Sequence, residues 1–432
     1  MRIAVLGAGT AGYLATAHIS RFFPQADLIH IFDSRISPIG VGEGTLPAFK
    51  MWLEAVTDAP FSLLAEACQA TRKVGVRFEG WGTTNPSFHH YFVGDRHAYH
   101  LSAARLPPFL QPHIHATRID KYVSHLHSTG RKVEVHFSDE THLTADLVFD
   151  ATGFPRSFGE GQILLRDIPT NAALVCRGPA IPFQAETRAV ARPHGWVFVI
   201  PLTTSTSYGY IYNAAISHED EVRTDFVRFL QQEGVGEVPP PRLLCFPSFV
   251  QRRLFDGALF RIGNAASFLE PLEATAIAVT LEELRLASLW LADGLLGATG
   301  GEKWNPQILD LLNQHLIRTV QAVALFVGWH YACGSLYDTP FWRFAQANYE
   351  ESLSKHAGSG LFADFQRFIQ ASAQVPDSHL EHLRDTPVYE QEIRPHLALD
   401  GEMGGFGILS FAQIGHGLGA YPETAIEDVP PN

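Results

Sequence analysis

The sequence of 432 residues predicts an α/β fold, with a Rossmann-like nucleotide-binding domain, an interleaved β-sheet domain and a helical C-terminal part. Three observations lead to this prediction. An apolar strand at residues 2–6 runs through a glycine-rich turn into an amphipathic helix. Short β-rich runs bounded by Pro, Gly or Thr occupy residues 165–250. From residue 277 onward, apolar residues recur at helical spacing.

The opening unit carries a dinucleotide-binding motif. Strand 2–6 is followed by a G-x-G-x-x-G turn and by a predicted helix over 13–22. In this motif the first glycine permits the tight turn, the second lets the backbone approach a pyrophosphate, and the third lets helix and strand pack closely. The helix N-terminus favours the anion. A second strand, 27–32, ends at an acid placed to accept a ribose hydroxyl. The nucleotide-binding positions predicted here are Gly7, Gly9, Thr10, Ala11, Gly12 and Asp33.

Two later segments repeat the pattern of a strand followed by a tight turn. The first, residues 146–153, is a buried strand that runs into a turn of small residues, and the second covers residues 258–266. Three such segments spread over the chain are typical of two-domain flavoprotein monooxygenases, which wrap an extended FAD. We therefore expect FAD rather than NAD. The second and third segments add Asp150, Gly153, Gly263 and Asn264 to the predicted cofactor-binding residues.

The remaining elements are predicted from periodicity and from Gly and Pro. A helix over 49–70 precedes a strand that bears Lys73, and residues 81–130 form an irregular, aromatic segment. A hairpin of 132–137 and 141–143 returns the chain to the FAD-binding domain, and the strand of segment 146–153 then returns it to the nucleotide-binding sheet. A second sheet contains strands 173–177, 195–201 and 208–212; helices follow over 277–295, 306–331 and 340–372. A glycine-rich tail, 401–419, folds back near the substrate.

Composition excludes several classes of protein. The net charge of −13 argues against nucleic acid and against attraction to acidic membranes. The four cysteines form no Cys-x-x-Cys pair, which favours a reducing compartment over a disulfide framework or a metal site. No apolar run reaches the length of a membrane span, and a core strand begins at residue 2, leaving no room for a signal peptide. We expect a cytoplasmic protein.

The 21 histidines raise the question of a metal site. His-x-His pairs at 113–115 and 125–127 can place two imidazoles on one face of a strand. No His-Glu-x-x-His motif accompanies them, and the predicted flavin supplies redox chemistry. We expect no metal, and some histidines along a substrate surface.

Several motifs together resemble the flavin-dependent tryptophan halogenases, a family within the flavoprotein monooxygenases of the glutathione reductase and p-hydroxybenzoate hydroxylase (GR2/PHBH) type. Matching pieces run from one end of the chain to the other. They include Gly40-Val41-Gly42-Glu43-Gly44-Thr45-Leu46-Pro47, Lys73-Val74-Gly75-Val76-Arg77-Phe78, the stretch 195–202, Glu270-Pro271-Leu272-Glu273, His330-Tyr331, Asp338-Thr339-Pro340-Phe341-Trp342 and a closing glycine turn at 415–419.

The resemblance implies a cofactor, a partner and a set of site residues. Reduced FAD, supplied by a partner flavin reductase, reacts with O2 to give a flavin hydroperoxide. In the family, halide attacks it, and the hypohalous acid reaches a lysine beside an aromatic substrate. The resemblance makes Lys73 and Glu273 catalytic and places Trp196 and Phe198 near the substrate. It adds Gly40, Val41, Gly42, Glu43, Thr45, Thr275, Ala276 and Ile277 to the cofactor-binding residues.

Departures from the family pattern bear on the reaction. The second indole of the Trp-x-Trp-x-Ile-Pro motif is Phe198, and the usual Ser-Thr-Gly after the acid is Ala274-Thr275-Ala276. An amide cradle for halide tolerates alanine only if its φ is negative and its methyl leaves room for the anion. The chain is also short for a halogenase of free tryptophan.

The departures lead to three functional hypotheses. We put first hydroxylation of a tryptophan side chain in a peptide or protein, as in relatives that mature quinone cofactors. The alternatives are a halogenase of an indole, phenol or pyrrole acting through HOCl or HOBr and Lys73, and a non-catalytic flavin-binding maturation factor.

The domain division predicted from these motifs is discontinuous. Residues 1–80, 131–165 and 255–295 form the FAD-binding domain, and residues 81–130 and 166–254 form a substrate or cap domain. Residues 296–432 form a helical C-terminal region that closes on the substrate site.

Overall fold

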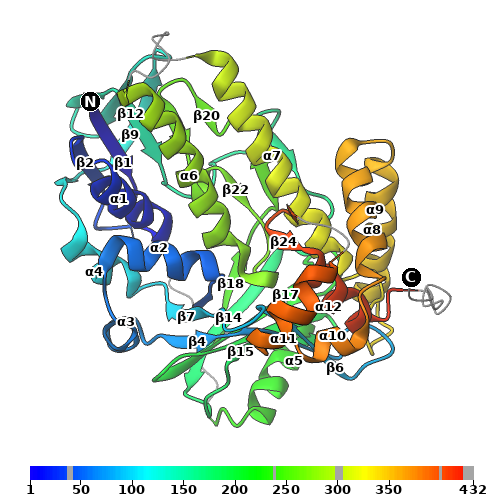
Figure 1. The fold of residues 1–432 in the computed structure, drawn as a ribbon. Helices are drawn as coiled ribbons and strands as arrows, with labels where there is room; N and C mark the ends of the chain where they lie inside the picture. The colour runs from blue at the N-terminus through cyan, green and yellow to red at the C-terminus, as the bar shows by residue number, and fades with distance from the viewer. Residues whose placement is uncertain (37–41, 237–239, 297–304, 398–400, 422–432) are drawn as a thin grey trace.

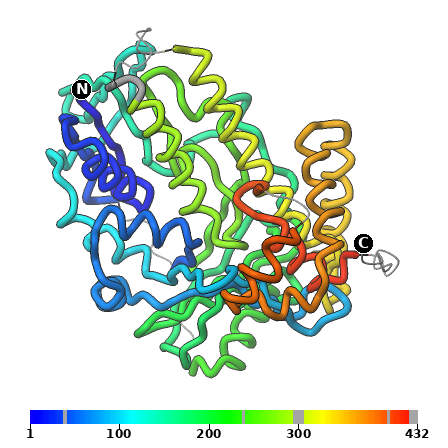
Figure 2. The backbone as a smooth tube through the Cα atoms, in the orientation of Figure 1, coloured from blue at the N-terminus to red at the C-terminus, as the bar shows by residue number. Residues whose placement is uncertain are grey.

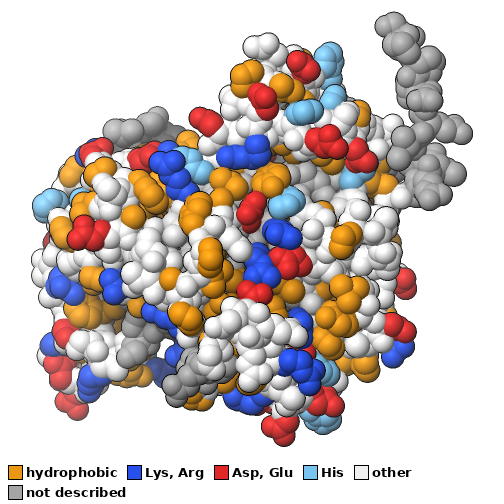
Figure 3. All heavy atoms as spheres, turned by 90° about the horizontal axis from the view of Figure 1, so that it is seen from below, with side chains coloured by type: hydrophobic (Ala, Val, Ile, Leu, Met, Phe, Trp, Pro, Cys, Tyr) orange, Lys and Arg blue, Asp and Glu red, His pale blue; other side chains and the backbone are white. Residues whose placement is uncertain are grey.

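The computed structural model describes residues 1–36, 42–236, 240–296, 305–397 and 401–421 (Figure 1). Within these ranges no helix combines the length and the apolar character needed to cross a membrane. On the face shown in Figure 3, acidic and basic side chains are interspersed with apolar ones.

A six-stranded sheet forms the nucleotide-binding part. Its order is β20 (Phe255–Asp256), β21 (Leu259–Arg261), β12 (Leu147–Asp150), β1 (Arg2–Leu6), β2 (Asp27–Phe32) and β8 (Thr117–Asp120). All pairs are parallel except β20–β21. These strands confirm the predicted opening unit and the two later strand-and-turn segments.

Alternation along β1 explains the two layers that cover this sheet. Ile3 and Val5 pack with α1 (Thr10–Phe22) in the main core. Ala4 and Leu6 face the other way, against a three-stranded sheet of β9 (Val123–Ser128), β10 (Val133–Phe137) and β11 (His142–Ala145). The predicted hairpin is β10 and β11 of this covering sheet, which packs on the nucleotide-binding sheet.

The predicted second sheet is confirmed and has seven strands. Their order is β18 (Arg242–Cys245), β14 (Ala172–Pro179), β17 (Ser205–Tyr212), β16 (Gly195–Pro201), β15 (Glu186–Arg192), β5 (Gly75–Glu79) and β6 (Ser87–Tyr91). Only β15 and β5 pair in parallel. Helix α5 (Glu219–Gln232) packs its apolar side chains onto one face of this sheet.

Three small sheets and several short helices complete the β-rich part. One sheet holds β3 (Gly42–Gly44), β7 (Ala98–Ser102) and β4 (Thr71–Lys73). Another holds β13 (Gln162–Leu164), β19 (Phe249–Gln251) and β22 (Ser267–Phe268), and β23 (Glu402–Met403) pairs with β24 (Phe406–Gly407). The short helices are α4 (Leu106–Leu110), α10 (Asp377–Glu381) and α11 (Thr386–Val388).

The C-terminal part is helical, as predicted. It contains α6 (Thr275–Leu296), α7 (Pro306–Trp329), α8 (Pro340–His356), α9 (Gly360–Ser372) and α12 (Ile408–Leu418). The tail returns toward the middle of the molecule (Figures 1 and 2). There α12 contacts both α9 and β6, so this helix lies beside the edge strand of the seven-stranded sheet.

Two predicted helices are each two helices in the structure. Residues 49–70 form α2 (Pro47–Thr57) and α3 (Phe61–Cys68), because Asp58 takes a left-handed conformation with φ 50° and Pro60 cannot continue a helix. Residues 340–372 form α8 and α9, with Gly358 at φ +80° between them.

Two other predictions were wrong. Residues 81–130 are not irregular, because they contain strands β6, β7, β8 and β9. The predicted closing glycine turn at 415–419 is largely helix α12. Gly415 and Gly417 both allow rings to pack closely against this helix. A Cβ added to Gly415 would lie 2.1 Å from the Tyr421 ring, and one added to Gly417 would lie 2.2 Å from the Phe88 ring. Only Gly419, at φ +69°, forms a turn.

The domain ranges stay a prediction, and two strands cross them. Strand β5 lies within the predicted FAD-binding range 1–80 but joins the seven-stranded sheet. Strand β8 lies within the predicted cap range 81–130 but pairs with β2. Both pairings are parallel and link distant parts of the chain, so strand spacing in the sequence does not reveal them.

Candidate active site

The glycine motif forms a turn that is closely packed on one side and open on the other. Gly7 has φ +109°, and an added Cβ would lie 2.4 Å from the carbonyl oxygen of Ala151. A Cβ on Gly12 would lie 2.1 Å from the carbonyl oxygen of Gly7, whereas one on Gly9 would meet nothing within 4 Å. Helix α1 begins at Thr10 with no side-chain cap, so its first amides remain available. This geometry fits a pyrophosphate.

The other two strand-and-turn segments converge on this turn. Ile262 N donates to Asp150 O at 3.0 Å, and a Cβ on Gly263 would lie 2.5 Å from the Ala11 Cβ. The Asp150 carboxylate accepts from Thr152 N at 3.0 Å and so shapes its own turn. Gly153 follows at φ +97° and faces open space, and Asn264 lies in the short 3₁₀ helix Gly263–Ala265. All three predicted segments therefore meet at one edge of the sheet.

Asp33 follows β2, as predicted, and already has a partner. Arg35 donates to its carboxylate through Nε at 2.8 Å and Nη2 at 2.7 Å. The hydrogen bonds from Arg35 lower the pKa of Asp33, which therefore stays ionised. A carboxylate has about four lone-pair sites, so the capacity to accept a ribose hydroxyl remains.

Strand β3 connects the glycine motif to the interior of the site. The Glu43 side chain hydrogen-bonds Thr10, and burial raises the pKa of Glu43 to about 7. Gly42 N donates to Ser207 Oγ at 3.1 Å. Thr45 is tied to β7, because its N and Oγ1 both donate to Tyr99 O, at 2.9 and 2.8 Å. Gly40 and Val41 lie outside the described residues.

Lys73 ends strand β4 and is fully buried. Its Nζ donates to Thr45 O at 3.2 Å and lies 5.4 Å from the centroid of the Phe92 ring. Burial lowers the pKa of Lys73 to about 8, against the opposing charge of Glu273. A Cβ added at Gly44 would lie 3.4 Å from Lys73 Nζ and 3.4 Å from the Ala274 Cβ. Strand β3 therefore lies against both Lys73 and the segment after Glu273.

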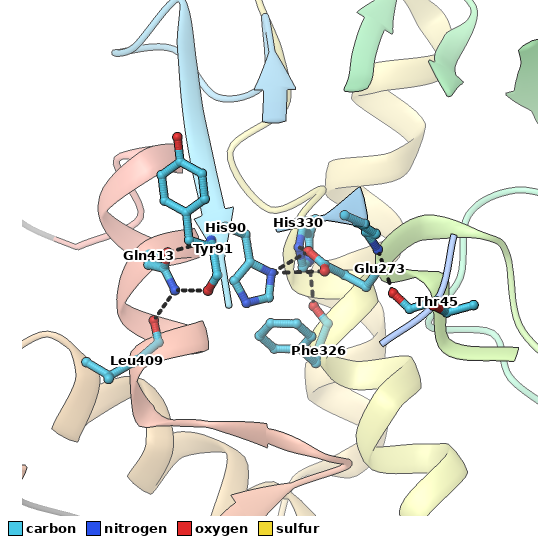
Figure 4. A network of polar contacts seen from close by, with 9 residues as sticks. Thr45, His90, Tyr91, Glu273, Phe326, His330, Leu409 and Gln413 are labelled. Carbon is cyan, nitrogen blue, oxygen red and sulfur yellow. Dashed lines mark hydrogen bonds and ion pairs between the residues drawn. The ribbon is translucent and has the colours of Figure 1, made fainter. Parts of the chain in front are cut away.

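Glu273 has a strained backbone and a carboxylate held by two histidines (Figure 4). Its φ is 66°, and that of Ala274 is 57°. His90 Nδ1 lies 2.9 Å from both carboxylate oxygens, and His330 Nε2 lies 3.0 Å from Oε1. Burial by itself raises the pKa of Glu273, but the charge and hydrogen bonds of the two histidines outweigh it and hold the pKa well below its usual range.

The pairing of Glu273 with two histidines was not predicted. His90 belongs to none of the motifs that carry the family resemblance, and His330 belongs only to the His330-Tyr331 motif. That motif was the available signal, since it places a titratable residue directly after the apolar stretch 322–329.

Behind Lys73, His100 is fixed as a neutral ring. Thr71 Oγ1 donates to Pro201 O at 2.8 Å, so it accepts from His100 Nδ1 at 3.0 Å. His100 Nε2 then accepts from Thr187 Oγ1 at 2.9 Å. Burial, together with the charge of Lys73, lowers the pKa of His100 well below its usual value.

Helix α6 begins directly after Glu273 and Ala274. Thr275 is buried, and its Oγ1 has no hydrogen-bond partner within the described part of the chain. Ala276 is helical and exposed and has no positive φ, which meets the first condition for an alanine in an amide cradle. Ile277 is buried in the core.

Trp196 and Phe198 are buried in the seven-stranded sheet. Trp196 Nε1 donates to Tyr331 Oη at 2.9 Å, and Tyr331 donates in turn to Glu270 Oε1 at 2.7 Å. Thr170 also donates to Glu270, and burial raises the pKa of this fully buried carboxyl to about 7. The Phe198 ring fills the space over Gly209, where an added Cβ would lie 2.2 Å away. Contact of either ring with substrate stays a prediction.

The histidines of the covering sheet form a separate cluster. His136 pairs across the strands with His125 and with His142, and the ring centroids lie 4.3 and 5.6 Å apart. The rings stack and do not converge on a point. No group of three His, Cys, Asp or Glu side chains suited to a metal ion is found in the part of the chain that the structure describes.

Comparison with known proteins identifies a matching family and solved structures with a similar fold. The profile of the tryptophan halogenase family matches residues 2–96 and 94–378. The tryptophan 7-halogenase of Lentzea aerocolonigenes is 22% identical over 425 aligned positions, which cover 79% of this chain and 78% of that protein. A flavin-dependent halogenase from Xanthomonas campestris has a similar fold, with a TM-score of 0.76 at 22% identity over 98% of this chain and 89% of that one. The structure of a tryptophan 6-halogenase from Streptomyces toxytricini gives a TM-score of 0.78 at 19% identity, covering 99% and 93%.

Proposed function

Because the chain belongs to the tryptophan halogenase family, we propose that it is a flavin-dependent halogenase that uses reduced FAD, O2 and a halide to halogenate an indole ring. One observation carries the proposal. Lys73 Nζ and the Ala274 Cβ both lie beside strand β3, each 3.4 Å from the position a Gly44 Cβ would take. Lys73, Ala274 next to Glu273, and strand β3 thus meet in one place.

The glycine turns that meet at the edge of the six-stranded sheet fit the pyrophosphate and ribose of FAD. The residues that we propose to hold it there are Gly7, Gly9, Thr10, Ala11, Gly12, Asp33, Asp150, Gly153, Gly263 and Asn264. We place the flavin ring against β3, through Gly42, Glu43 and Thr45. When bound, reduced FAD supplies the two electrons that turn O2 and halide into an oxidant of the HOCl or HOBr kind.

We place the halide at the first amides of α6, from Thr275, Ala276 and Ile277. The N-terminus of a 22-residue helix carries unpaired N–H groups and the positive end of the helix dipole, both of which favour an anion. Ala276 adopts an ordinary helical conformation, so its methyl group does not strain the backbone of this cradle.

Lys73 and Glu273 divide the chemistry. The buried ammonium of Lys73 donates a hydrogen bond to the oxidant and holds it beside the aromatic ring. Glu273, as a carboxylate, accepts the proton that leaves the ring carbon when the halogen adds. The atoms balance: an aromatic C–H, a halide, O2, reduced FAD and a proton give the C–halogen bond, oxidised FAD and two molecules of water.

The comparisons favour halogenation over hydroxylation, the reaction that the sequence analysis put first. Hydroxylation retains one supporting observation, which is that Ala274 provides no hydroxyl between Lys73 and the helix. In that case the oxygen would pass directly to the ring, and product formation would not depend on halide.

Partner and substrate follow from the same proposal. Halogenases of this class take reduced flavin from a partner flavin reductase, and we propose the same supply here. Two of the relatives compared above, from Lentzea aerocolonigenes and Streptomyces toxytricini, are named for tryptophan, so free tryptophan is the first substrate to test. A peptide- or protein-borne tryptophan, which the sequence analysis preferred, has no support from these relatives.

The test is mass spectrometry of the products after supplying reduced FAD and O2, with and without bromide. Free tryptophan, indole and a tryptophan-containing peptide are offered in parallel. A bromine isotope doublet that requires bromide is the expected result. Addition of oxygen without halide dependence would instead establish the hydroxylase. If none of the aromatic substrates gave a product, the non-catalytic flavin-binding hypothesis would remain.

A further inference from the structure

His330 is the C-cap residue of helix α7, and its side chain hydrogen-bonds a carbonyl of the last turn. At the helix end the His330 amide donates to Val327 O at 3.2 Å. In a regular α-helix it would donate to the carbonyl four residues back, which is that of Phe326. The carbonyl of Phe326 is thereby left without that bond, and His330 Nδ1 lies 2.9 Å from its oxygen. A carbonyl oxygen can only accept. His330 Nδ1 therefore carries a proton.

The other ring nitrogen faces a carboxylate. His330 Nε2 lies 3.0 Å from Glu273 Oε1, and both side chains are buried (Figure 4). A neutral imidazole has one N–H, which here is already committed at Nδ1. The short contact with Glu273 therefore needs one more proton, carried either by Nε2 as an imidazolium or by Glu273 as a carboxylic acid.

Two features place that proton on His330. The ring sits at the C-terminus of a 24-residue helix, whose negative pole favours a cation. His90 Nδ1, 2.9 Å from both oxygens of Glu273, gives the carboxylate a second donor, and hydrogen bonds to the charged form favour it.

We propose that His330 is a positioning residue that acts through Glu273: as a buried imidazolium it holds that carboxylate ionised and fixed in orientation near Lys73. The inference rests on the proposed function for the roles of Lys73 and Glu273. Removing the positive charge of the imidazolium leaves an uncompensated buried carboxylate, which takes up a proton and ceases to be a base.

Other titratable groups surround this pair. His90 faces Glu273 from β6, and Lys73 lies on β4 with the neutral His100 behind it. Glu273 helps to keep the Lys73 ammonium charged, because its charge raises the pKa of Lys73 while burial lowers it to about 8. Loss of the Glu273 charge therefore shifts the protonation of Lys73 to lower pH as well.

The chain supplies a matched control in His18. This ring is also buried and also has a partner on each nitrogen, Trp52 at 3.1 Å and Ser288 at 2.6 Å. The Trp52 indole N–H donates to His18 Nδ1, so that nitrogen carries no proton, and burial lowers the pKa of His18 to about 4. His18 must be a neutral ring where His330 is a charged one.

The direct test is ¹⁵N NMR of the protein with labelled histidine at pH 7, with His330→Gln and His18→Gln used to assign the two rings. We expect both nitrogens of His330 to be protonated, and only Nε2 of His18. A His330 ring that is unprotonated at Nε2 would overturn the proposal. This readout needs no turnover, so it stands apart from the success or failure of the halogenation assay.

The second test is the pH profile of product formation. His330→Gln retains a donor toward Glu273 but no charge. We expect kcat to fall on the order of 10²-fold near neutral pH, with less change in KM, and the acidic limb to move to higher pH. His18→Gln should keep the wild-type profile. An equal loss of kcat at every pH in His330→Gln would show a purely structural histidine and refute the positioning role.

Discussion

The buried carboxyl of Glu270 gives a stability prediction that can be worked from the structure. Glu270 is fully buried and accepts hydrogen bonds from Tyr331 and Thr170, and burial raises its pKa from 4.5 to about 7. A carboxyl whose pKa is higher in the folded state contributes stability that is fully present below pH 4.5 and is lost as the pH rises to about 7. The interval of about 2.5 units corresponds to about 3 kcal/mol.

The perturbation is Glu270→Gln, which resembles the protonated carboxyl in shape and cannot ionise. Stability is measured by denaturant unfolding of wild type and variant at several pH values from 4.5 to 8. The difference between the two proteins isolates Glu270, because Glu43 and Glu283, whose pKa values burial also raises, are present in both. We expect the free energy of unfolding of the variant, relative to that of wild type, to increase by about 3 kcal/mol between pH 4.5 and 7. A difference that does not change with pH would refute the reasoning.

Three further predictions concern the site. Lys73→Ala should keep FAD bound, by flavin fluorescence, and lose product formation, whereas Lys132→Ala, which removes an exposed lysine, should keep full activity. Gly12→Ala should lose FAD binding, since its Cβ would lie 2.1 Å from a backbone oxygen of the glycine turn. Gln413→Ala removes two hydrogen bonds to the backbone of Tyr91, at 2.7 and 3.2 Å. The amides of β6 should therefore exchange faster, with their free energy of opening lowered by about 1 to 3 kcal/mol. Gln413→Glu, which loses only the donor, should fall in between, and unchanged exchange in both variants would contradict this role.

Much of the fold was predictable because local pattern and tertiary structure agree. Strand β1 alternates between two apolar faces, and each face is buried against a different layer. The glycine motif predicted its own turn because only glycine fits at positions 7 and 12, where an added Cβ would lie 2.4 and 2.1 Å from a backbone oxygen. Helix breaks were predictable in principle, since Pro60 stands inside the stretch 49–70 that was assigned to one helix.

The site was only partly predictable because its contacts are non-local. His90 reaches Glu273 across 183 positions of the chain, and His330 reaches it across 57. No periodicity links these three residues. Lys73 and Glu273 entered the prediction only through the family resemblance, which carries positions but not partners. The resemblance therefore identified a lysine and an acid, and the histidines that hold the acid became visible only in the structure.

The backbone at Glu273 and Ala274 runs against local preference. Two consecutive residues other than glycine adopt left-handed φ values, at a cost on the order of 1 kcal/mol each. Glycine at 274 would remove part of this cost, yet alanine stands there, with its methyl 3.4 Å from where a Gly44 Cβ would lie. The strained turn places the Glu273 carboxylate between His90 and His330 (Figure 4). Backbone strain and two imidazoles thus fix the position of the carboxylate that we propose as the base, so that its orientation does not depend on substrate.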